Sequence, residues 1–389
     1  MSSLYKEFPK LYLIDATAFC YRAFYALRGL STSWGQPTNA IYGFVNMLTK
    51  IIKENKPQYI AICFDVSRKT FRQEKFSAYK ITRPSMPDDL AVQIPWIKKI
   101  ISAYGICYLE REGFEADDII ATLVERFKDN FSSIIIVSSD KDILQLVDEK
   151  VVVISPYKDK EKIYTEKEVI QRYGVKPSQI PDILALMGDS SDNIPGILGI
   201  GEKTAVELIK RFYSLENLKN HLDKIGSLNI KNTIKENLPF LELSHQLIKL
   251  NREVPLDLGW QDLKIKEPDW LQLYNIFRKL EFKRLLKGIP IPNRSVLKNP
   301  SCQKLSLEDF KKHISNEVII FCDYRKDYIY FLCPENLICE CKIDEARSIL
   351  EDPEIKKIGY DLKTLFNFSK SKGIEIKFPY FDIMVASYL

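Results

Sequence analysis

Three apolar runs that each end in an acidic residue place the strongest limit on how this chain can fold. Leu11–Ile14 is followed by Asp15, Tyr59–Phe64 by Asp65, and Ile134–Ser139 by Asp140. Helical patterns separate the runs, which is typical of an open α/β fold around a parallel sheet. Because ligands bind at the carboxyl ends of the strands in such sheets, we expect these acids to share one crevice.

A denser group of acids lies in Gly113–Ala121, at the start of a predicted amphipathic helix. Glu115 and Asp118 share one helical face, and two like charges about 4 Å apart repel by roughly 4 kcal/mol at an effective dielectric of about 20. A cation or bound protons must offset this repulsion. Taken alone, acids in a first helical turn are equally well explained by the helix dipole, and one strand-end Asp by a turn or an N-cap.

The number of acids favours a metal site over caps and turns. Every candidate ligand is an oxygen donor, and the three histidines lie outside these segments. This chemistry favours Mg²⁺, with Mn²⁺ as a substitute, over zinc or iron. So many carboxylates predict two ions, the usual arrangement for phosphodiester hydrolysis. The candidate ligands are Asp15, Asp65, Glu115, Asp117, Asp118, Asp140, Asp142, Asp189 and Asp192.

A basic segment follows Asp65 and ends near Pro87. A basic stretch is usually a solvated helix face, but this one leaves directly from a candidate metal ligand. Cations that bind phosphates and aromatic side chains that stack on bases suit that position, so we predict a contact with nucleic acid. The segment contains Arg68, Lys69, Arg72, Lys75, Lys80 and Arg83, interleaved with Phe71, Phe76 and Tyr79.

A glycine-rich stretch, Gly196–Ala205, opens a predicted helix at Glu202–Phe212. Glycines before a helix N-terminus expose backbone N–H groups, which predicts a phosphate grip. The spacing excludes a nucleotide-binding P-loop, because one residue separates Gly201 from Lys203, and no strand precedes the stretch as in a Rossmann loop. The candidate DNA contacts here are Gly196, Gly199, Gly201, Lys203 and Thr204.

The composition indicates a globular protein of two or three domains, since 46% of its 389 residues are hydrophobic. The net charge of +5 understates the local basicity, because metal ions would neutralise the clustered acids. We see no signal peptide and no run long enough to span a membrane, and therefore expect a cytoplasmic protein without a membrane partner. Its eight cysteines contain no C-x-x-C pair, which fits reduced thiols.

These motifs together resemble the 5′-nuclease domain of bacterial DNA polymerase I, in the flap endonuclease family. The resemblance covers roughly residues 8 to 290, with the motifs in the same order. It implies a PIN-like parallel-sheet core, a helical arch over the active site, and a helix-three-turn-helix (helix-hairpin-helix) that holds the duplex. It also implies a structure-specific phosphodiesterase that removes 5′ flaps, nicked ends and RNA primers in DNA replication and repair.

The resemblance also assigns roles to individual residues. Asp15, Asp65, Glu115 and Asp117 would hold the first ion, and Asp117, Asp140, Asp142 and Asp192 would surround the second. Asp118 and Asp189 would support the ions through water or outer contacts. Lys80 and Arg83 would face the scissile phosphate, and the hairpin is a candidate site for K⁺.

The expected layout is a catalytic domain at residues 1–176 with its arch at about 66–95, a DNA-binding subdomain at 177–290, a linker at 291–300 and a last domain at 301–389. Three strands are expected in the last domain, at 317–322, 328–333 and 337–341, followed by helices near 345–351 and 362–370. It resembles the beginning of a ribonuclease-H-like 3′-5′ exonuclease domain. The resemblance thus implies the N-terminal part of a DNA polymerase I-like protein, with a polymerase domain, missing from this chain, as a candidate partner. Arg325, two residues after Asp323, stands where the family has a second acid, and Leu365 stands where the family has Asp. We therefore expect this domain to be inactive.

Two alternatives stay open at this stage. A stand-alone 5′-3′ exonuclease would keep every catalytic residue and differ only in its C-terminal context. A catalytically silent DNA-binding scaffold would keep the glycine-rich stretch but should have lost site acids, and none is missing.

Overall fold

The computed structural model describes residues 9–66, 69–157, 160–290, 303–333 and 337–387, and the chain divides into two compact units at residues 290 and 291. Arg68 of the basic segment and the predicted linker at 291–300 lie outside the described residues. No described helix is long and apolar enough to span a membrane.

The first unit is built on a sheet of six strands in the order β3-β2-β1-β4-β5-β6. Every neighbouring pair is parallel except β5 and β6. All three apolar runs form strands at the centre of this sheet, which confirms the predicted α/β fold. The strands are β1 (Lys10–Asp15), β2 (Tyr59–Phe64), β3 (Cys107–Glu110), β4 (Ser133–Val137), β5 (Val151–Tyr157) and β6 (Lys160–Tyr164).

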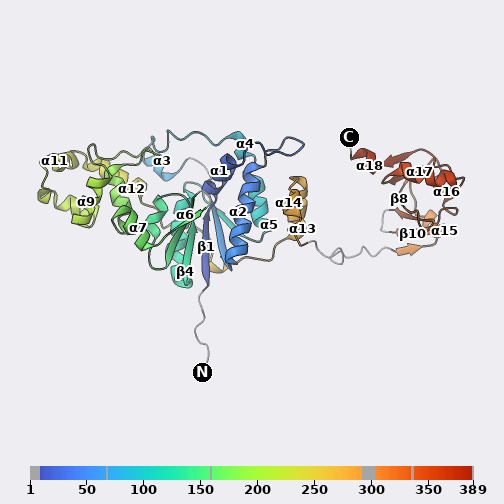
Figure 1. Ribbon diagram of the computed structural model, residues 1–389, viewed down its shortest axis with the longest axis horizontal. Helices are drawn as coiled ribbons and strands as arrows, with labels where there is room; N and C mark the ends of the chain where they lie inside the picture. Colours follow the sequence, from blue (N-terminus) through green and yellow to red (C-terminus); the bar gives the residue numbers. More distant parts are fainter. Residues whose placement is uncertain (1–8, 67–68, 158–159, 291–302, 334–336, 388–389) are drawn as a thin grey trace, which may run out of the picture. The chain divides into compact units, whose positions relative to one another are not determined.

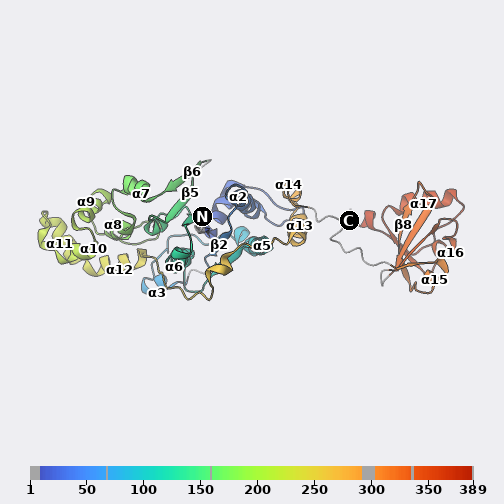
Figure 2. The same ribbon diagram turned by 90° about the horizontal axis from the view of Figure 1, so that it is seen from below.

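Helices cover both faces of this sheet, which is why the central strands are apolar at successive positions rather than at alternate ones (Figures 1 and 2). On one face, Tyr12 and Ile14 pack with α1 (Ala16–Ala26), α2 (Asn39–Asn55), α5 (Ile94–Ala103) and α13 (Trp270–Lys279). On the other, Leu11 and Leu13 pack with α6 (Ala116–Phe127), whose N-terminal turn carries the acidic cluster.

The segment between β2 and β3 crosses the carboxyl edge of the sheet. It contains two short helices, α3 (Phe71–Lys75) and α4 (Asp88–Ala91), joined by turns, before the longer helix α5. Helical structure over residues 88–103 is divided into α4 and α5. Pro95 stands at the start of α5, where it supplies no N–H to continue the preceding helix.

A helical subdomain follows the sheet and shares the core of α6. The predicted helix at Glu202–Phe212 is α9, and a capping box of Thr165 and Glu168 opens α7. Figures 1 and 2 show α9 to α12 together at one end of this unit. The helices of this subdomain are α7 (Glu166–Tyr173), α8 (Ile180–Met187), α9, α10 (Leu215–Asn220), α11 (Leu228–Glu236) and α12 (Leu238–Ile248), whereas α14 (Lys283–Leu286) packs beside α13 at the other end of the unit.

The second unit contains a mixed sheet in the order β12-β11-β8-β9-β10-β7. Its three predicted strands are present as β8, β9 and β10, and both predicted helices as α16 and α17. The elements are β7 (Gln303–Leu305), α15 (Leu307–Lys311), β8 (Glu317–Asp323), β9 (Tyr328–Cys333), β10 (Leu337–Lys342), α16 (Arg347–Leu350), β11 (Lys356–Gly359), α17 (Leu362–Ser371), β12 (Tyr380–Asp382) and α18 (Ile383–Ala386).

Candidate metal centre

The acids that end β1 and β2 meet the N-terminal turn of α6 at the carboxyl edge of the sheet. The Ala18 N–H donates to Asp15 Oδ1 (3.1 Å), so Asp15 also caps α1, and the Ala116 N–H donates to Asp65 Oδ1 (2.7 Å). A cavity of about 160 Å³ opens between these elements. Its acidic lining consists of Asp15, Asp65, Glu115, Asp117 and Asp140, opposite Lys80 and Arg83.

Burial and mutual repulsion make these carboxylates hard to ionise without a counter-charge. Burial, followed by the charge of Asp65, raises the pKa of Asp15 to about 7. Burial and Asp140 raise the pKa of Asp117 well above its usual range, and burial and Glu115 raise that of Asp65. A divalent cation in the cavity would remove this penalty, because it stabilises the ionised form of every surrounding carboxylate.

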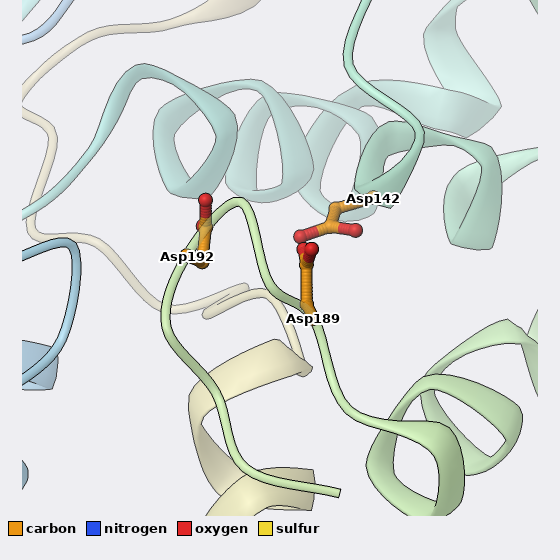
Figure 3. A group of neighbouring side chains, drawn as sticks. All are labelled: Asp142, Asp189 and Asp192. Carbon is orange, nitrogen blue, oxygen red and sulfur yellow. The ribbon is translucent and has the colours of Figure 1, made fainter. Parts of the chain in front are cut away.

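A second acidic group contains Asp142, Asp189 and Asp192, which offer oxygen atoms within 4.8 Å of one another (Figure 3). Burial and Asp140 raise the pKa of Asp142 well above its usual range. Burial opposes the charge of Asp189, but hydrogen bonds from Lys141 (2.8 Å) and Ser191 lower its pKa. Asp142 Oδ1 is buried and has no hydrogen-bond partner among the described residues, as expected of an oxygen left for a cation.

The two groups fit hard divalent cations. Eight carboxylates face this edge, and four cationic side chains, Lys80, Arg83, Lys141 and Arg72, pair with three of them, Glu115, Asp189 and Asp192. Among the described residues, the other five carboxylates have no ion pair, and two divalent ions would offset four of those charges. The observed grouping differs from the expected one in two respects: Asp189 joins Asp142 and Asp192, and Asp140 lines the cavity of Asp15, together with Asp117.

Lys80 and Arg83 lie beside the acids and form ion pairs with them. Lys80 Nζ lies 2.8 Å from Glu115 Oε1 and 3.6 Å from Asp192 Oδ2, while Arg83 pairs with Asp192 Oδ1. Burial opposes the charge of Lys80, but Glu115 and Asp192 raise its pKa, so it stays protonated at neutral pH. Both cations are partly exposed.

Two predicted DNA contacts and one candidate metal ligand are wrong because the side chains are buried in ion pairs and hydrogen bonds. Arg72 is 1% exposed and pairs with Asp118, so its guanidinium is not available to DNA. Asp118 is fully buried and uses both oxygens for Arg72, which excludes it as a direct ligand but not from the outer role expected of it. Tyr79 is 4% exposed and donates to Glu115 and Asp192, so its ring is not free to stack on bases.

Gly196 packs closely against the backbone of the preceding helix end, which is a second reason for a glycine at this position. A Cβ on Gly196 would lie 2.3 Å from the carbonyl carbon of Met187 and 2.4 Å from the nitrogen of Gly188. Gly199, with a φ of +83°, and Gly201 instead have open space where a Cβ would be. Lys203 is exposed. The open hairpin positions, where close approach of a phosphate would explain the glycines, are Gly199 and Gly201, next to Lys203 and Thr204.

We expect Gly196→Ala and Gly201→Ala to separate stability from binding. Gly196→Ala should lower the free energy of unfolding by about 1–3 kcal/mol, because backbone atoms must shift to admit the methyl group. Gly201→Ala should leave the Tm within a few degrees of the wild-type value but weaken duplex binding, because the added methyl obstructs the approach of phosphate. Thermal unfolding and fluorescence anisotropy with a labelled duplex measure the two effects. Equal effects of the two variants in both assays would contradict these assignments.

Lys141 and Ser138 were not among the predicted site residues. Lys141 is paired with Asp189, and Ser138 Oγ donates to Asp15 Oδ2 (2.8 Å). The one sign in the sequence that Lys141 lies in the site is its position between two candidate ligands, Asp140 and Asp142. Its partner lies nearly fifty residues further along the chain, so the pairing becomes visible only in the fold.

A parallel sheet with buried carboxylates at its carboxyl edge, cations above them and an attached helical subdomain defines a metal-dependent nuclease. Residues 10–174 match the family profile "5′-3′ exonuclease, N-terminal resolvase-like domain", and residues 175–270 match "5′-3′ exonuclease, C-terminal SAM fold". A 5′-3′ exonuclease of Aquifex aeolicus is 47% identical over 279 residues, which cover 72% of this chain and 94% of that protein. The chain therefore belongs to the 5′-3′ exonuclease family, of the DNA polymerase I type.

The similarity to DNA polymerase I extends into the second unit. The DNA polymerase I of Caldicellulosiruptor bescii is 37% identical over 398 residues, covering 98% of this chain and 46% of that protein. The chain thus spans about half the length of that relative. Among solved structures, a complex of the bacteriophage T5 flap endonuclease with DNA and metal ions has a TM-score of 0.53 at 20% identity, covering 61% of this chain and 88% of the other. That similarity concerns the fold.

Proposed function

We propose that the chain is a structure-specific 5′-nuclease that hydrolyses phosphodiester bonds at 5′ flaps, nicked ends and RNA-primer junctions in DNA replication and repair. The observation that carries the proposal is the convergence of eight carboxylates with Lys80 and Arg83 at one edge of the sheet. The family membership and the DNA-bound T5 relative support it.

In this proposal the two acidic groups hold two Mg²⁺ ions. Asp15, Asp65, Glu115, Asp117 and Asp140 surround the first position, and Asp142, Asp189 and Asp192 surround the second. The bound ions would activate a water and stabilise the leaving oxygen. Lys80 and Arg83 neutralise charge on the reacting phosphate, and the hairpin with Lys203 holds the duplex, with K⁺ a candidate ion there.

The purified chain and an end-labelled 5′-flap duplex test this function, with Mg²⁺ and then with EDTA. We expect Mg²⁺-dependent cleavage near the base of the flap. A ladder of mononucleotide steps would favour the stand-alone 5′-3′ exonuclease instead. Duplex binding without any cleavage in Mg²⁺ or Mn²⁺ would favour the DNA-binding scaffold and overturn the proposal.

We further propose that the second unit has no proofreading activity. Asp323, Asp361 and Asp382 lie near the carboxyl ends of neighbouring parallel strands, and all three carboxylates accept local hydrogen bonds. Asp382 accepts from the Asp361 and Leu362 N–H groups, Asp361 caps α17 through Thr364, and Asp323 accepts from the Arg325 N–H. Leu365 is buried and offers no oxygen.

A primer with a mismatched 3′ end tests the second unit, on a template whose 5′ ends are protected. We expect no shortening from the 3′ end in Mg²⁺ or Mn²⁺, because two ions need several free carboxylates. Progressive shortening that survives Asp117→Asn but is lost in Asp323→Ala would give the chain a second active site.

A further inference from the structure

Arg72 occupies the centre of a buried ion pair between segments that are far apart in the sequence. Its Nη1 and Nη2 donate to the two oxygens of Asp118 at 2.7 and 2.8 Å, and both side chains are almost completely buried. Arg72 Nε also donates to the carbonyl oxygen of Leu247 (2.7 Å), just before the end of α12. The guanidinium of Arg72 thus contacts both α6 and the C-terminal end of α12 in the helical subdomain.

Asp118 extends this junction in two directions. It accepts from the Asn251 N–H (2.8 Å), in the segment that follows α12, and from the Glu115 N–H (3.1 Å), at the start of α6. One turn later, Thr122 donates to the Asp118 carbonyl and accepts from the Val254 N–H (3.0 Å). The N-terminal half of α6 is therefore fixed to residues 251–254 by side chains that do not line the acidic cavity.

The junction lies directly beside the metal-binding carboxylates. Glu115 and Asp117 are within three residues of Asp118, and Arg72 Nη1 lies 3.3 Å from Glu115 Oε2. We propose that Arg72 and Asp118 are positioning residues, which hold Glu115 and Asp117 in register with the helical subdomain that holds the duplex. This inference rests on the proposed function, since it concerns the same site. Partners that orient ligands typically change metal affinity or activity by about 10–100-fold when replaced.

The double variant Arg72→Met/Asp118→Leu separates positioning from stability. Removing one partner leaves a buried charge unpaired, whereas replacing both with apolar side chains of similar volume often preserves stability. We expect the double variant to keep a Tm near that of the wild type and a duplex Kd, measured in EDTA, within about threefold. Its single-turnover cleavage rate should fall about 10–100-fold, and the Mg²⁺ concentration for half-maximal rate should rise.

Arg126→Met is the matched control. Arg126 lies on α6, as Asp118 does, and like Arg72 it donates to backbone carbonyls, those of Leu256 and Leu258. Unlike Arg72, it is exposed, and it lies near the C-terminal end of α6. This variant should keep the wild-type rate and Mg²⁺ dependence.

A folded double variant with the wild-type rate and Mg²⁺ dependence would overturn the inference. If the double variant does not fold, Arg72→Lys decides the question, because it keeps the charge but loses the two-pronged geometry. A folded Arg72→Lys protein should be slowed with unchanged duplex binding, and wild-type rates would overturn the inference. A wild-type protein that cleaves no flap would refute the proposed function instead.

Discussion

Asp117→Asn is expected to lower single-turnover cleavage by roughly 10³-fold or more, beyond the range of residues that only orient a ligand. Asp117 is surrounded by other carboxylates, and burial with Asp140 raises its pKa well above the usual range. Asn keeps the shape of the side chain but removes the charge that a cation requires. Duplex affinity in EDTA should stay the same or improve, because DNA is bound through Lys and Arg and the variant removes one negative charge.

Asp182→Asn provides the control for this substitution. Asp182 is also a largely buried acid, but it pairs with His245 (2.9 Å) between α8 and α12, away from the acidic cavity. Its cleavage rate should remain within about threefold of the wild type. Asp117→Asn should not lower the Tm in EDTA, since it relieves repulsion among buried carboxylates. Near-normal cleavage by Asp117→Asn in Mg²⁺ would remove the two-ion assignment.

The sequence was sufficient to predict the sheet and the acidic edge because both depend on local patterns. Unbroken apolar runs such as Tyr59–Phe64 identify strands covered on both faces, and an acid at the end of each run must lie at the carboxyl edge. The capping box at Thr165 is equally local, with the Thr165 N–H donating to Glu168 (3.1 Å). Helix and strand boundaries in both units follow from such signals.

The roles of Arg72 and Gly196 could not be predicted in this way, because their partners are distant in the sequence or on the backbone. An Arg in a basic, aromatic segment has the same local pattern whether it faces phosphate or a buried acid 46 residues away. Likewise, Gly196 has the pattern of a phosphate loop, and its contact with Met187 and Gly188 gives a second reason for a glycine that only the fold reveals. In both cases tertiary packing supplies what the local pattern does not.

Lys80→Ala is expected to lower the single-turnover rate by about 10²–10³-fold, the range typical of a lost charge-stabilising group. The ammonium lies between Glu115 and Asp192 at the edge of the cavity, and its neighbours keep it charged. Its backbone contributes separately, since the Lys80 N–H donates to the Asp192 carbonyl (2.9 Å), a bond that Ala retains. The variant therefore removes the charge without removing the contact between the segment and the loop after α8.

Lys75→Ala is the matched control, because Lys75 belongs to the same basic segment but contacts Gln246 (3.2 Å) at an exposed position. Lys75→Ala should leave the single-turnover rate within about threefold of the wild type. Removing a lysine that contacts a phosphate should change the slope of log binding constant against log salt concentration by about one. Rapid-quench cleavage and anisotropy over a salt series measure the two quantities. If Lys80→Ala weakened binding and left the single-turnover rate unchanged, Lys80 would hold the DNA backbone and another cation would face the reacting phosphate. Arg83 would then be the first candidate, since it also pairs with Asp192 and is the more exposed of the two.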